Sequence, residues 1–294
     1  MKKILNIVLA ISLAVVFTVS LSACATGNTP AATSAAPASA AASTAPAELG
    51  EFKVGLECGY APFNWTQIDN ANGGVQISGT NEFAGGYDVE IAKLIAKGLN
   101  KKLVIVKTIW DGLTPAVQSG TIDAIIAGMS PKADRKQTLD FTDYYYQSVL
   151  VIVVKKGGKF ENATSLADFT GAKITAQIQT LHYDVIDQIT GVIKQTASQD
   201  FPTMRVALES GAIDGYISEK PEGLSAQAAN SAFKMIEFAT DKGFKVTNDD
   251  ISVSVGLKKG SDLTTKINEI LKTITEVQRK QLMDSAIINQ PSTK

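Results

Sequence analysis

One segment in the middle of the chain combines residue types that bind anions. Ser130 and Pro131 are favoured at a helix N-cap and at the first helical position, so they predict the start of a helix. Unpaired backbone amides at such a start attract an anion. Arg135 follows one turn later, and its guanidinium can hold a carboxylate through two parallel hydrogen bonds. Ser130 and Arg135 therefore predict a carboxylate clamp, although an arginine between two charged neighbours is also typical of a solvated surface.

Metal chemistry, thiol chemistry and nucleic-acid binding are not indicated. His182 is the sole histidine and has no companions at the spacing of metal ligands, so we expect no metal and no cofactor. Only Cys58 remains beside Cys24, which excludes a disulfide framework and favours a small buried side chain at Cys58. Leaving Lys2 and Lys3 out of the 28 basic residues leaves 26 against 29 acidic ones, and this net charge of −3 gives no footprint for nucleic acid.

The first part of the chain is typical of an export signal followed by a tether. Two lysines precede a long apolar run without acidic residues, which predicts a secretory signal over residues 1–23. The end of this run, Leu21-Ser-Ala-Cys24, resembles the lipobox of bacterial lipoproteins and implies an acylated Cys24 as the mature N-terminus. Residues 24–49 are mostly Ala, Thr, Ser, Pro and Gly, a composition that predicts a flexible tether. We expect a protein outside the cytoplasm, attached to the outer face of the cytoplasmic membrane by this lipid only.

Beyond the tether, short apolar runs alternate with helical patterns, which favours βαβ units and mostly parallel sheets. Residues 52–56 and 103–106 are predicted strands. The apolar spacing of residues 89–99 predicts a helix between them. The polar stretch 66–82 is rich in Asn and Gly and predicts a surface hairpin or loop.

A repeat indicates how these elements are organised. Ala116-Val-Gln-Ser-Gly120-Thr-Ile-Asp123-Ala-Ile-Ile126 recurs as Ala207-Leu-Glu-Ser-Gly211-Ala-Ile-Asp214-Gly-Tyr-Ile217, so Gly120 and Gly211 are 91 residues apart. Each copy predicts a helix that ends at a left-handed glycine, a tight turn and a buried strand. The repeat predicts two similar lobes, although a chance match of a common helix-glycine-strand unit would give the same pattern.

The two copies also predict where a ligand lies. Ligands of open parallel sheets bind beyond the carboxyl ends of the strands. Those ends carry Gly128-Met-Ser130-Pro131 in one copy and Ser218-Glu-Lys-Pro221 in the other, so both can face one cleft.

The connections between the lobes are expected to be extended. The β-branched run 148–154 leads into the second lobe and the segment 251–255 leads back, which predicts a two-stranded hinge. We therefore expect lobe 1 at residues 50–148 and 253–294, and lobe 2 at residues 149–252. A last helix, from residue 262 to about 286, should cover lobe 1.

A set of motifs, each weak alone, occurs in a characteristic order. The motifs are Tyr60-Ala-Pro-Phe63, Gly86-Tyr-Asp88-Val, Trp110-Asp-Gly-Leu113, Gly120-Thr-Ile-Asp123, Gly128-Met-Ser130 with Arg135, and Phe141-Thr-Asp143. This set resembles the polar amino-acid branch of the family 3 bacterial extracellular solute-binding proteins, over residues 51 to about 290. The resemblance implies the α/β type II periplasmic-binding-protein fold, with two α/β lobes joined by a two-stranded hinge.

The resemblance also implies which residues bind the ligand. Tyr60 and Trp110 would sandwich its side chain, where ordinary core packing is the alternative. Ser130 and Arg135 would take its α-carboxylate, which Gln179 and Thr180 would approach from lobe 2. A helix predicted over residues 181–189 would give Thr180 a second anion-attracting helix start. The full set of implied ligand-binding residues is Glu57, Tyr60, Phe63, Trp65, Trp110, Gly128, Ser130, Arg135, Gln179, Thr180 and Glu219.

Two acidic positions bear on the choice of ligand. Glu57 stands where relatives often carry an Asp that engages the end of the ligand side chain, and a carboxylate beside two aromatic faces suits a guanidinium, ammonium or imidazolium. Relatives that bind an amide also use an acid there. For the α-ammonium, relatives commonly carry an Asp that aligns with Ser218, with Glu219 immediately after it. Glu219 could reach back to this place, and so could Glu222.

These inferences predict a substrate-binding lipoprotein of an ABC importer, not an enzyme, that captures a free polar and basic amino acid (arginine, lysine or histidine) by hinge closure. Its permease and ATPase would be separate chains, because the sequence has no P-loop motif and no permease spans. We expect a monomer. Glutamine or another neutral polar amino acid is an open alternative. A same-fold enzyme such as a cyclohexadienyl dehydratase, which would need a general acid in the cleft, and an adhesin or sensor domain are others.

Overall fold

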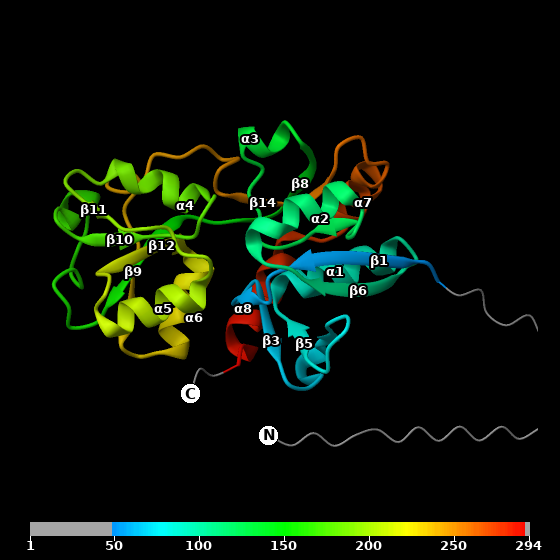
Figure 1. Ribbon diagram of the computed structural model, residues 1–294, viewed down its shortest axis with the longest axis horizontal. Helices are drawn as coiled ribbons and strands as arrows, with labels where there is room; N and C mark the ends of the chain where they lie inside the picture. Colours follow the sequence, from blue (N-terminus) through cyan, green and yellow to red (C-terminus); the bar gives the residue numbers. More distant parts are fainter. Residues whose placement is uncertain (1–48, 292–294) are drawn as a thin grey trace, which may run out of the picture. The chain divides into compact units, whose positions relative to one another are not determined.

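The computed structural model describes residues 49–291, which belong to one compact unit (Figure 1). The expected signal, Cys24 and nearly all of the expected tether lie outside the described residues. Within them, two five-stranded sheets and one four-stranded sheet carry the architecture. None of the described helices combines the length and the apolar character needed to cross a bilayer.

The first sheet has the strand order β6-β1-β7-β14-β8. β1 is parallel to β6 and β7, and β14 is antiparallel to β7 and β8. Val54 of β1, the middle one of the three parallel strands, pairs with Ile105 on one side and Ala124 on the other. The strands are β1 (Glu51–Leu56), β6 (Lys102–Lys107), β7 (Ala124–Ile125), β8 (Leu139–Gln147) and β14 (Ser252–Lys258).

The second sheet has the order β11-β10-β12-β9-β13. β10 is parallel to β11 and β12, and β9 is antiparallel to β12 and β13. This is the same sequence of parallel and antiparallel neighbours as in the first sheet, so the two sheets form the two similar lobes that the repeat predicts. The strands are β9 (Leu150–Lys155), β10 (Lys173–Thr175), β11 (Ile193–Lys194), β12 (Gly215–Glu219) and β13 (Phe233–Ile236).

The helices cover the sheets, and a small meander projects from the first lobe. In Figure 1, α1, α2 and α7 lie with β1 and β6, whereas α4, α5 and α6 lie with β10 and β12. The α-helices are α1 (Tyr87–Gly98), α2 (Leu113–Ser119), α3 (Ala133–Lys136), α4 (Leu181–Asp184), α5 (Phe201–Ser210), α6 (Lys220–Ala229), α7 (Leu263–Lys272) and α8 (Glu276–Asn289). The meander strands are β2 (Gly59–Tyr60), β3 (Asn64–Gln67), β4 (Val75–Gln76) and β5 (Phe83–Gly85). Short 3-10 helices are η1 (Ala71–Gly73), η2 (Trp110–Gly112), η3 (Leu166–Phe169) and η4 (Val185–Gln188).

The sequence repeat corresponds to one unit built twice. Gly120 caps α2 with φ +80° and Gly211 caps α5 with φ +78°, the left-handed conformation that glycine adopts without a steric penalty. The acid three residues later has the same role in both copies. The Oδ2 atom of Asp123 accepts a hydrogen bond from the Lys53 backbone N–H at 2.7 Å. The Oδ2 atom of Asp214 accepts one from the Lys173 backbone N–H at 2.8 Å, which fixes each repeat against the neighbouring strand.

Two extended crossings connect the lobes. β8 passes into β9 through Ser148, whose backbone N–H donates to the Ile251 carbonyl of the returning segment at 3.0 Å. Gln147 at the end of β8 pairs with Ser252 at the start of β14, so the outgoing and returning chains run side by side.

The buried apolar side chains form two clusters. The larger cluster fills the first lobe and continues to the face of the second sheet that carries Tyr216, against which Phe201 of α5 packs. The smaller one covers the opposite face of that sheet, where Ile217 and Ile174 lie. Adjacent residues of β12 thus point into different clusters, as the alternation of a strand requires.

Three expected helices differ from the structure. The helix expected from Ser130 begins only at Ala133, because Ser130 and Pro131 lie in a preceding turn in which the Lys132 backbone N–H donates to the Ser130 carbonyl at 2.9 Å. The helix expected over 181–189 is the single turn of α4 followed by η4. The last helix is interrupted at Thr275, whose side chain caps a new helix, α8, by accepting from the Gln278 backbone N–H.

Candidate functional site

Arg135 on α3 bridges the two lobes. Its Nη1 donates to the Ser130 carbonyl at 2.8 Å, and its Nη2 donates to the Gln179 carbonyl of the second lobe at 2.7 Å. The guanidinium carbon also lies 5.1 Å from the centre of the Trp110 ring, a cation–π contact. Burial lowers the pKa of Arg135 to about 10, which leaves the group charged at neutral pH. The structure thus brings together three of the predicted residues from the first lobe and one from the second.

The segment before α4 faces Arg135 from the second lobe. Gln179 is exposed and has φ +57°, and the Thr180 hydroxyl donates to the Gln177 carbonyl at 2.6 Å. A non-glycine residue with positive φ is uncommon and is a pointer to function. Cys58, beside Glu57, is another such residue, with φ +56°. Each of these two residues with positive φ is therefore next to a predicted site residue, Thr180 or Glu57.

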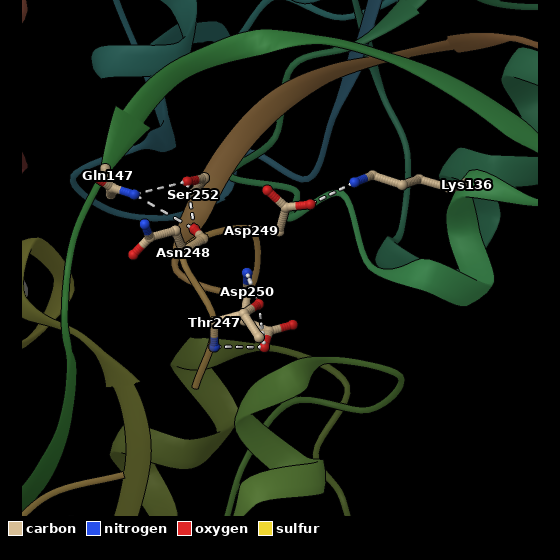
Figure 2. A network of polar contacts seen from close by, with 7 residues as sticks. All are labelled: Lys136, Gln147, Thr247, Asn248, Asp249, Asp250 and Ser252. Carbon is tan, nitrogen blue, oxygen red and sulfur yellow. Dashed lines mark hydrogen bonds and ion pairs between the residues drawn. The ribbon is translucent and has the colours of Figure 1, made fainter. Parts of the chain in front are cut away.

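Ser130 connects the site to the returning crossing. Its hydroxyl donates to the Asp250 carbonyl at 3.0 Å. Figure 2 shows this crossing: Asp250 Oδ2 accepts from the backbone N–H and hydroxyl of Thr247, and Lys136 of α3 pairs with Asp249 at 2.6 Å. The segment that carries Ser130 and Arg135 is thereby fastened to the crossing.

A second ion pair on the same segment spans the lobes. Lys132 Nζ lies 2.6 Å from Asp184 Oδ2 of α4. The Lys132 side chain is 16% exposed and that of Asp184 is 55% exposed, so water screens this pair only in part.

Glu57 follows β1 and contacts the second lobe through Gln177. The Gln177 amide donates to Glu57 Oε1 at 2.8 Å, whereas Glu57 Oε2 is buried without a hydrogen-bond partner. Burial raises the pKa of Glu57 to about 8, and the Gln177 hydrogen bond opposes this rise. The acids Asp200, Asp88 and Asp111 add to it.

Glu57 and Trp110 line the same cavity of about 540 Å³. The cavity lies between the end of β1, the η2 turn and the start of α5, and its charged lining residues are Glu57, Lys107, Asp111 and Asp200. Three of these four side chains are acidic, so the cavity favours a cation.

The Tyr60 ring is packed between aromatic rings of both lobes. Its ring stacks on Phe63 of the first lobe at 4.8 Å and on Phe201 of the second at 4.3 Å. Its buried hydroxyl has no hydrogen-bond partner. Gly128, with φ +61°, passes so close that a Cβ atom there would lie 2.6 Å from Tyr60 Cε1. Phe63 is itself fully buried beneath Tyr60.

Glu219, at the end of β12, is buried next to His182. Glu219 Oε1 lies 3.6 Å from His182 Nε2, while Glu219 Oε2 and His182 Nδ1 have no hydrogen-bond partner. The neighbouring Ser218 hydroxyl is also buried and unpaired. Burial raises the pKa of Tyr60 well above its ordinary value, and the negative charge of Glu219 adds to this rise.

Glu222 differs from Glu219 in having a cationic partner. Its Oε1 accepts from Arg205 at 2.8 Å and from the Tyr216 hydroxyl at 2.9 Å, and its Oε2 has no partner. Glu222 is fully buried, and the guanidinium of Arg205 provides the opposite charge that a buried carboxylate requires. Glu219 is therefore the acid of this pair whose charge is less compensated by the protein.

Trp65 lies apart from these residues. Its indole Nε1 donates to Gln67 Oε1 at 2.7 Å within the meander. It lines a different cavity, beside Ala286 of α8.

Several residues that the sequence did not single out for the site support it. Asp88 is fully buried and accepts from Asn64 Nδ2 and from the Tyr145 hydroxyl, both at 2.8 Å. The same hydroxyl accepts from the Gly128 backbone N–H at 3.1 Å, so Asp88 positions the strand end that leads to Ser130. Burial raises the pKa of Asp88 to about 7. The sequence places Asp88 in the Gly86-Tyr-Asp88 motif but indicates no role for its side chain.

Gln177 and His182 had no sequence signal that reveals their contacts. The Gln177–Glu57 bond joins residues 120 positions apart. His182 has no companions at the spacing of metal ligands, and nothing in the sequence indicates its contact with Glu219.

Comparison with known proteins gives a consistent result. A family model described as bacterial extracellular solute-binding proteins, family 3, matches residues 52–285. A probable histidine-binding protein of Campylobacter jejuni is 31% identical over 203 residues, which cover 65% of this chain and 72% of the relative.

Solved structures match over a larger part of the chain. An amino acid ABC transporter substrate-binding protein of Streptococcus pneumoniae bound to L-arginine gives a TM-score of 0.71 at 25% identity, covering 81% of this chain and 94% of the other. An ancestral arginine-binding protein bound to glutamine gives a TM-score of 0.65 at 27% identity, covering 80% and 97%. The chain has the fold of these type II periplasmic amino-acid-binding proteins.

The close approach at Gly128 leads to a matched pair of substitutions. Gly120→Ala should cost about 1 kcal/mol of unfolding free energy, because alanine is strained at positive φ but meets no atom within 4 Å. Gly128→Ala should cost about 2–3 kcal/mol, because its Cβ would also collide with Tyr60. Urea denaturation of the two variants measures the difference. Equal losses would show that Tyr60 does not pack against Gly128.

Proposed function

The chain belongs to family 3 of the bacterial extracellular solute-binding proteins, and from this membership we propose that it captures a free amino acid for an ABC importer. The ligand would lie between the lobes, with its α-carboxylate at Arg135, Ser130 and Thr180 and its α-ammonium at Glu219. Its side chain would extend toward Glu57 and Trp110, with the Tyr60 hydroxyl nearby. Phe63 and Gly128 support Tyr60 and Ser130, and Gln179 accepts from Arg135.

One observation carries this proposal: a guanidinium bonded to both lobes lies in the same interface as buried acidic oxygens without partners. Arg135 supplies the positive end, and Glu219, together with Glu57 once a cation has displaced its proton, supplies the negative one. A zwitterion is complementary to such a site, because buried charges are stable only when they are paired or hydrogen-bonded.

The proposed ligand is a polar and basic L-amino acid such as arginine, lysine or histidine. The acidic cavity beside Glu57 and Trp110 supports it, since carboxylates and an indole face attract a guanidinium or an ammonium. The relatives that bind histidine and arginine agree with this choice. Because an ancestral arginine-binding protein was solved with glutamine, an amino acid with a neutral amide side chain is the second candidate ligand.

We further propose that capture occurs by closure about the two crossings, with lobe 1 at residues 50–148 and 253–294 and lobe 2 at residues 149–252. Contacts of Arg135 with Gln179, of Glu57 with Gln177 and of Lys132 with Asp184 join the lobes, and each would form as they close. A ligand that contacts both lobes favours the closed form. Acylation of Cys24 would hold the protein at the membrane, where separate permease and ATPase chains receive the amino acid.

An enzymatic function has less support than binding. The matched relatives described above are named as binding proteins. Two of the buried acids that could serve as a general acid already have partners in the protein: Glu57 accepts from an amide, and Glu222 pairs with Arg205.

A thermal-shift screen of the common amino acids tests the proposal. At least one should raise the melting temperature of the wild type through mass action. Arg135→Ala should weaken that ligand about 100-fold or more in calorimetry, because charge-assisted hydrogen bonds contribute about 1.5–3 kcal/mol each. Arg135→Lys should be intermediate, and the ligand-free melting temperature should fall by only about 2–4 °C in either variant. Unchanged binding by Arg135→Ala would refute the clamp.

The pKa of Glu57 predicts how cation binding depends on pH. A carboxyl whose pKa is raised to about 8 is mostly protonated in the free protein at pH 7, so a cationic side chain must displace its proton. The affinity for L-arginine should therefore increase as the pH rises from 6 to 8, and binding near pH 7 should release up to one proton. Calorimetry in buffers of different ionisation enthalpy counts this proton.

Two further measurements bear on Glu57. Glu57→Gln should abolish the proton release and weaken arginine more than glutamine, whereas equal losses would exclude a cationic site. The raised pKa also favours the protonated folded state, and its contribution to stability, complete below pH 4.5, should be lost as the pH rises through about 8.

The Lys132–Asp184 pair predicts the rate of ligand release. Asp184→Asn should speed release about two- to five-fold at low salt, the effect expected from a partly exposed ion pair, and 0.5 M salt should abolish the difference. Asp262→Asn removes an ion pair of 2.9 Å between the N-cap residue of α7 and Lys266, and it is the matched control. Stopped-flow tryptophan fluorescence measures both rates. Release from Asp184→Asn at the control rate in low salt would contradict closure across this pair.

A further inference from the structure

Gln177 belongs to the second lobe and contacts Glu57, the acid of the first lobe toward which the ligand side chain would extend. It follows β10, is 2% exposed, and is held by a bridge to Ser198 of the neighbouring chain segment. Its amide nitrogen donates to the Gln199 carbonyl at 3.0 Å and to Glu57 Oε1 at 2.8 Å. Both amide protons are thus used, one within the second lobe and one across to the first.

The Gln177 hydrogen bond decides which oxygen of Glu57 is available. Oε1 is occupied by the amide, and Oε2 is buried and has no hydrogen-bond partner. A carboxylate fixed through one oxygen presents the other in a defined direction. Glu57 lines the adjacent cavity, and we expect a cationic group bound there to pair with Oε2, the oxygen that the protein leaves without a partner.

The backbone around Gln177 connects this contact to the carboxylate end of the site. The Gln177 carbonyl accepts from the Thr180 hydroxyl at 2.6 Å, and the Gln179 carbonyl accepts from Arg135. Residues 177–180 therefore contact both the acid and the guanidinium of the first lobe. Closure that places this segment on Arg135 also places the Gln177 amide on Glu57.

We propose that Gln177 is a specificity-determining residue that acts through Glu57, orienting its carboxylate toward the guanidinium or ammonium of a basic amino acid. This inference rests on the proposed capture of an amino acid between the lobes. It adds that selection among amino acids is made jointly by the two lobes, because the acid comes from one and the group that orients it comes from the other.

Within residues 49–291, Gln177 is the only residue that donates a hydrogen bond directly to Glu57. Asp200, Asp88 and Asp111 act on Glu57 as like charges, and Lys107 lines the same cavity. Removing the amide would thus leave an acid that is more difficult to ionise. Cationic ligands would lose affinity, and neutral ligands would be little affected.

The test compares Gln177→Met with the wild type in calorimetry, using L-arginine, L-lysine, L-histidine and L-glutamine. Gln177→Met keeps the side-chain length and removes the donor. We expect the best cationic ligand to weaken about 10-fold or more, the loss of one hydrogen bond to a charged group, and L-glutamine to change less than about two-fold. The affinity for the cation rises with pH, and the midpoint of this rise should lie at a higher pH in Gln177→Met than in the wild type.

Gln188→Met is the matched control, since Gln188 of η4 makes its amide hydrogen bond to the Lys245 carbonyl, away from Glu57. It should leave the ratio of affinities unchanged. Should Gln177→Met fail to fold by circular dichroism, Gln177→Asn, which draws the amide back by one methylene, should show the same loss of selectivity.

The outcomes separate this inference from the function on which it rests. A wild type that binds none of the common amino acids overturns the proposed function. A wild type that binds only neutral amino acids, or a Gln177→Met variant that weakens arginine and glutamine equally or not at all, overturns the role of Gln177 and leaves capture of an amino acid intact.

Discussion

A carboxylate or guanidinium that leaves water loses a large solvation free energy unless an opposite charge or a set of hydrogen bonds replaces the water. This constraint governs the interface between the lobes. Arg135 meets it with two carbonyls and an indole face. Glu222 meets it with Arg205, and Glu57 meets it in part by a raised pKa. Glu57 and Glu219 each keep one buried oxygen without a hydrogen-bond partner, and the proposed zwitterionic ligand would supply that partner.

The architecture delivers these groups by building one unit twice. In each lobe the central parallel strand ends where a site residue begins: Glu57 follows β1, and Gln177 follows β10. Glu219 ends β12, the middle strand of the second sheet. The lobes are thus similar in strand order but different in charge, and the positive group of the proposed site comes from the first lobe alone.

Much of this organisation could be predicted from local sequence. The Gly-x-Ile-Asp repeat predicted two similar units, and both glycines have the left-handed conformation that the pattern requires. The strands around residues 52–56 and 103–106 and the buried Cys58 are confirmed as well. These features depend on neighbours in the chain, where periodicity and turn chemistry are informative.

The failures concern competition between local and distant contacts. Ser130 and Pro131 have the residue types of a helix start, but the Ser130 hydroxyl is used by the crossing at Asp250 and the helix begins later. Gln177 looks like any glutamine after a strand until the second lobe brings it to Glu57. The roles predicted for Tyr60, Trp110 and Glu219 remain predictions. Tyr60 in addition stacks on Phe201, a residue that no motif indicated.

The pairing of Gln147 with Ser252 has a topological consequence. The chain leaves the first sheet and re-enters it on two adjacent antiparallel strands, so the whole second lobe is an insertion whose ends lie together. The first lobe would keep its five-stranded order if a short hairpin loop replaced that insertion, because none of its strands comes from the inserted segment. The second lobe, in contrast, is continuous in sequence. The second lobe, with Gln177, can therefore be exchanged between relatives as one continuous stretch of chain that is joined to the first lobe at two paired residues, Gln147 and Ser252.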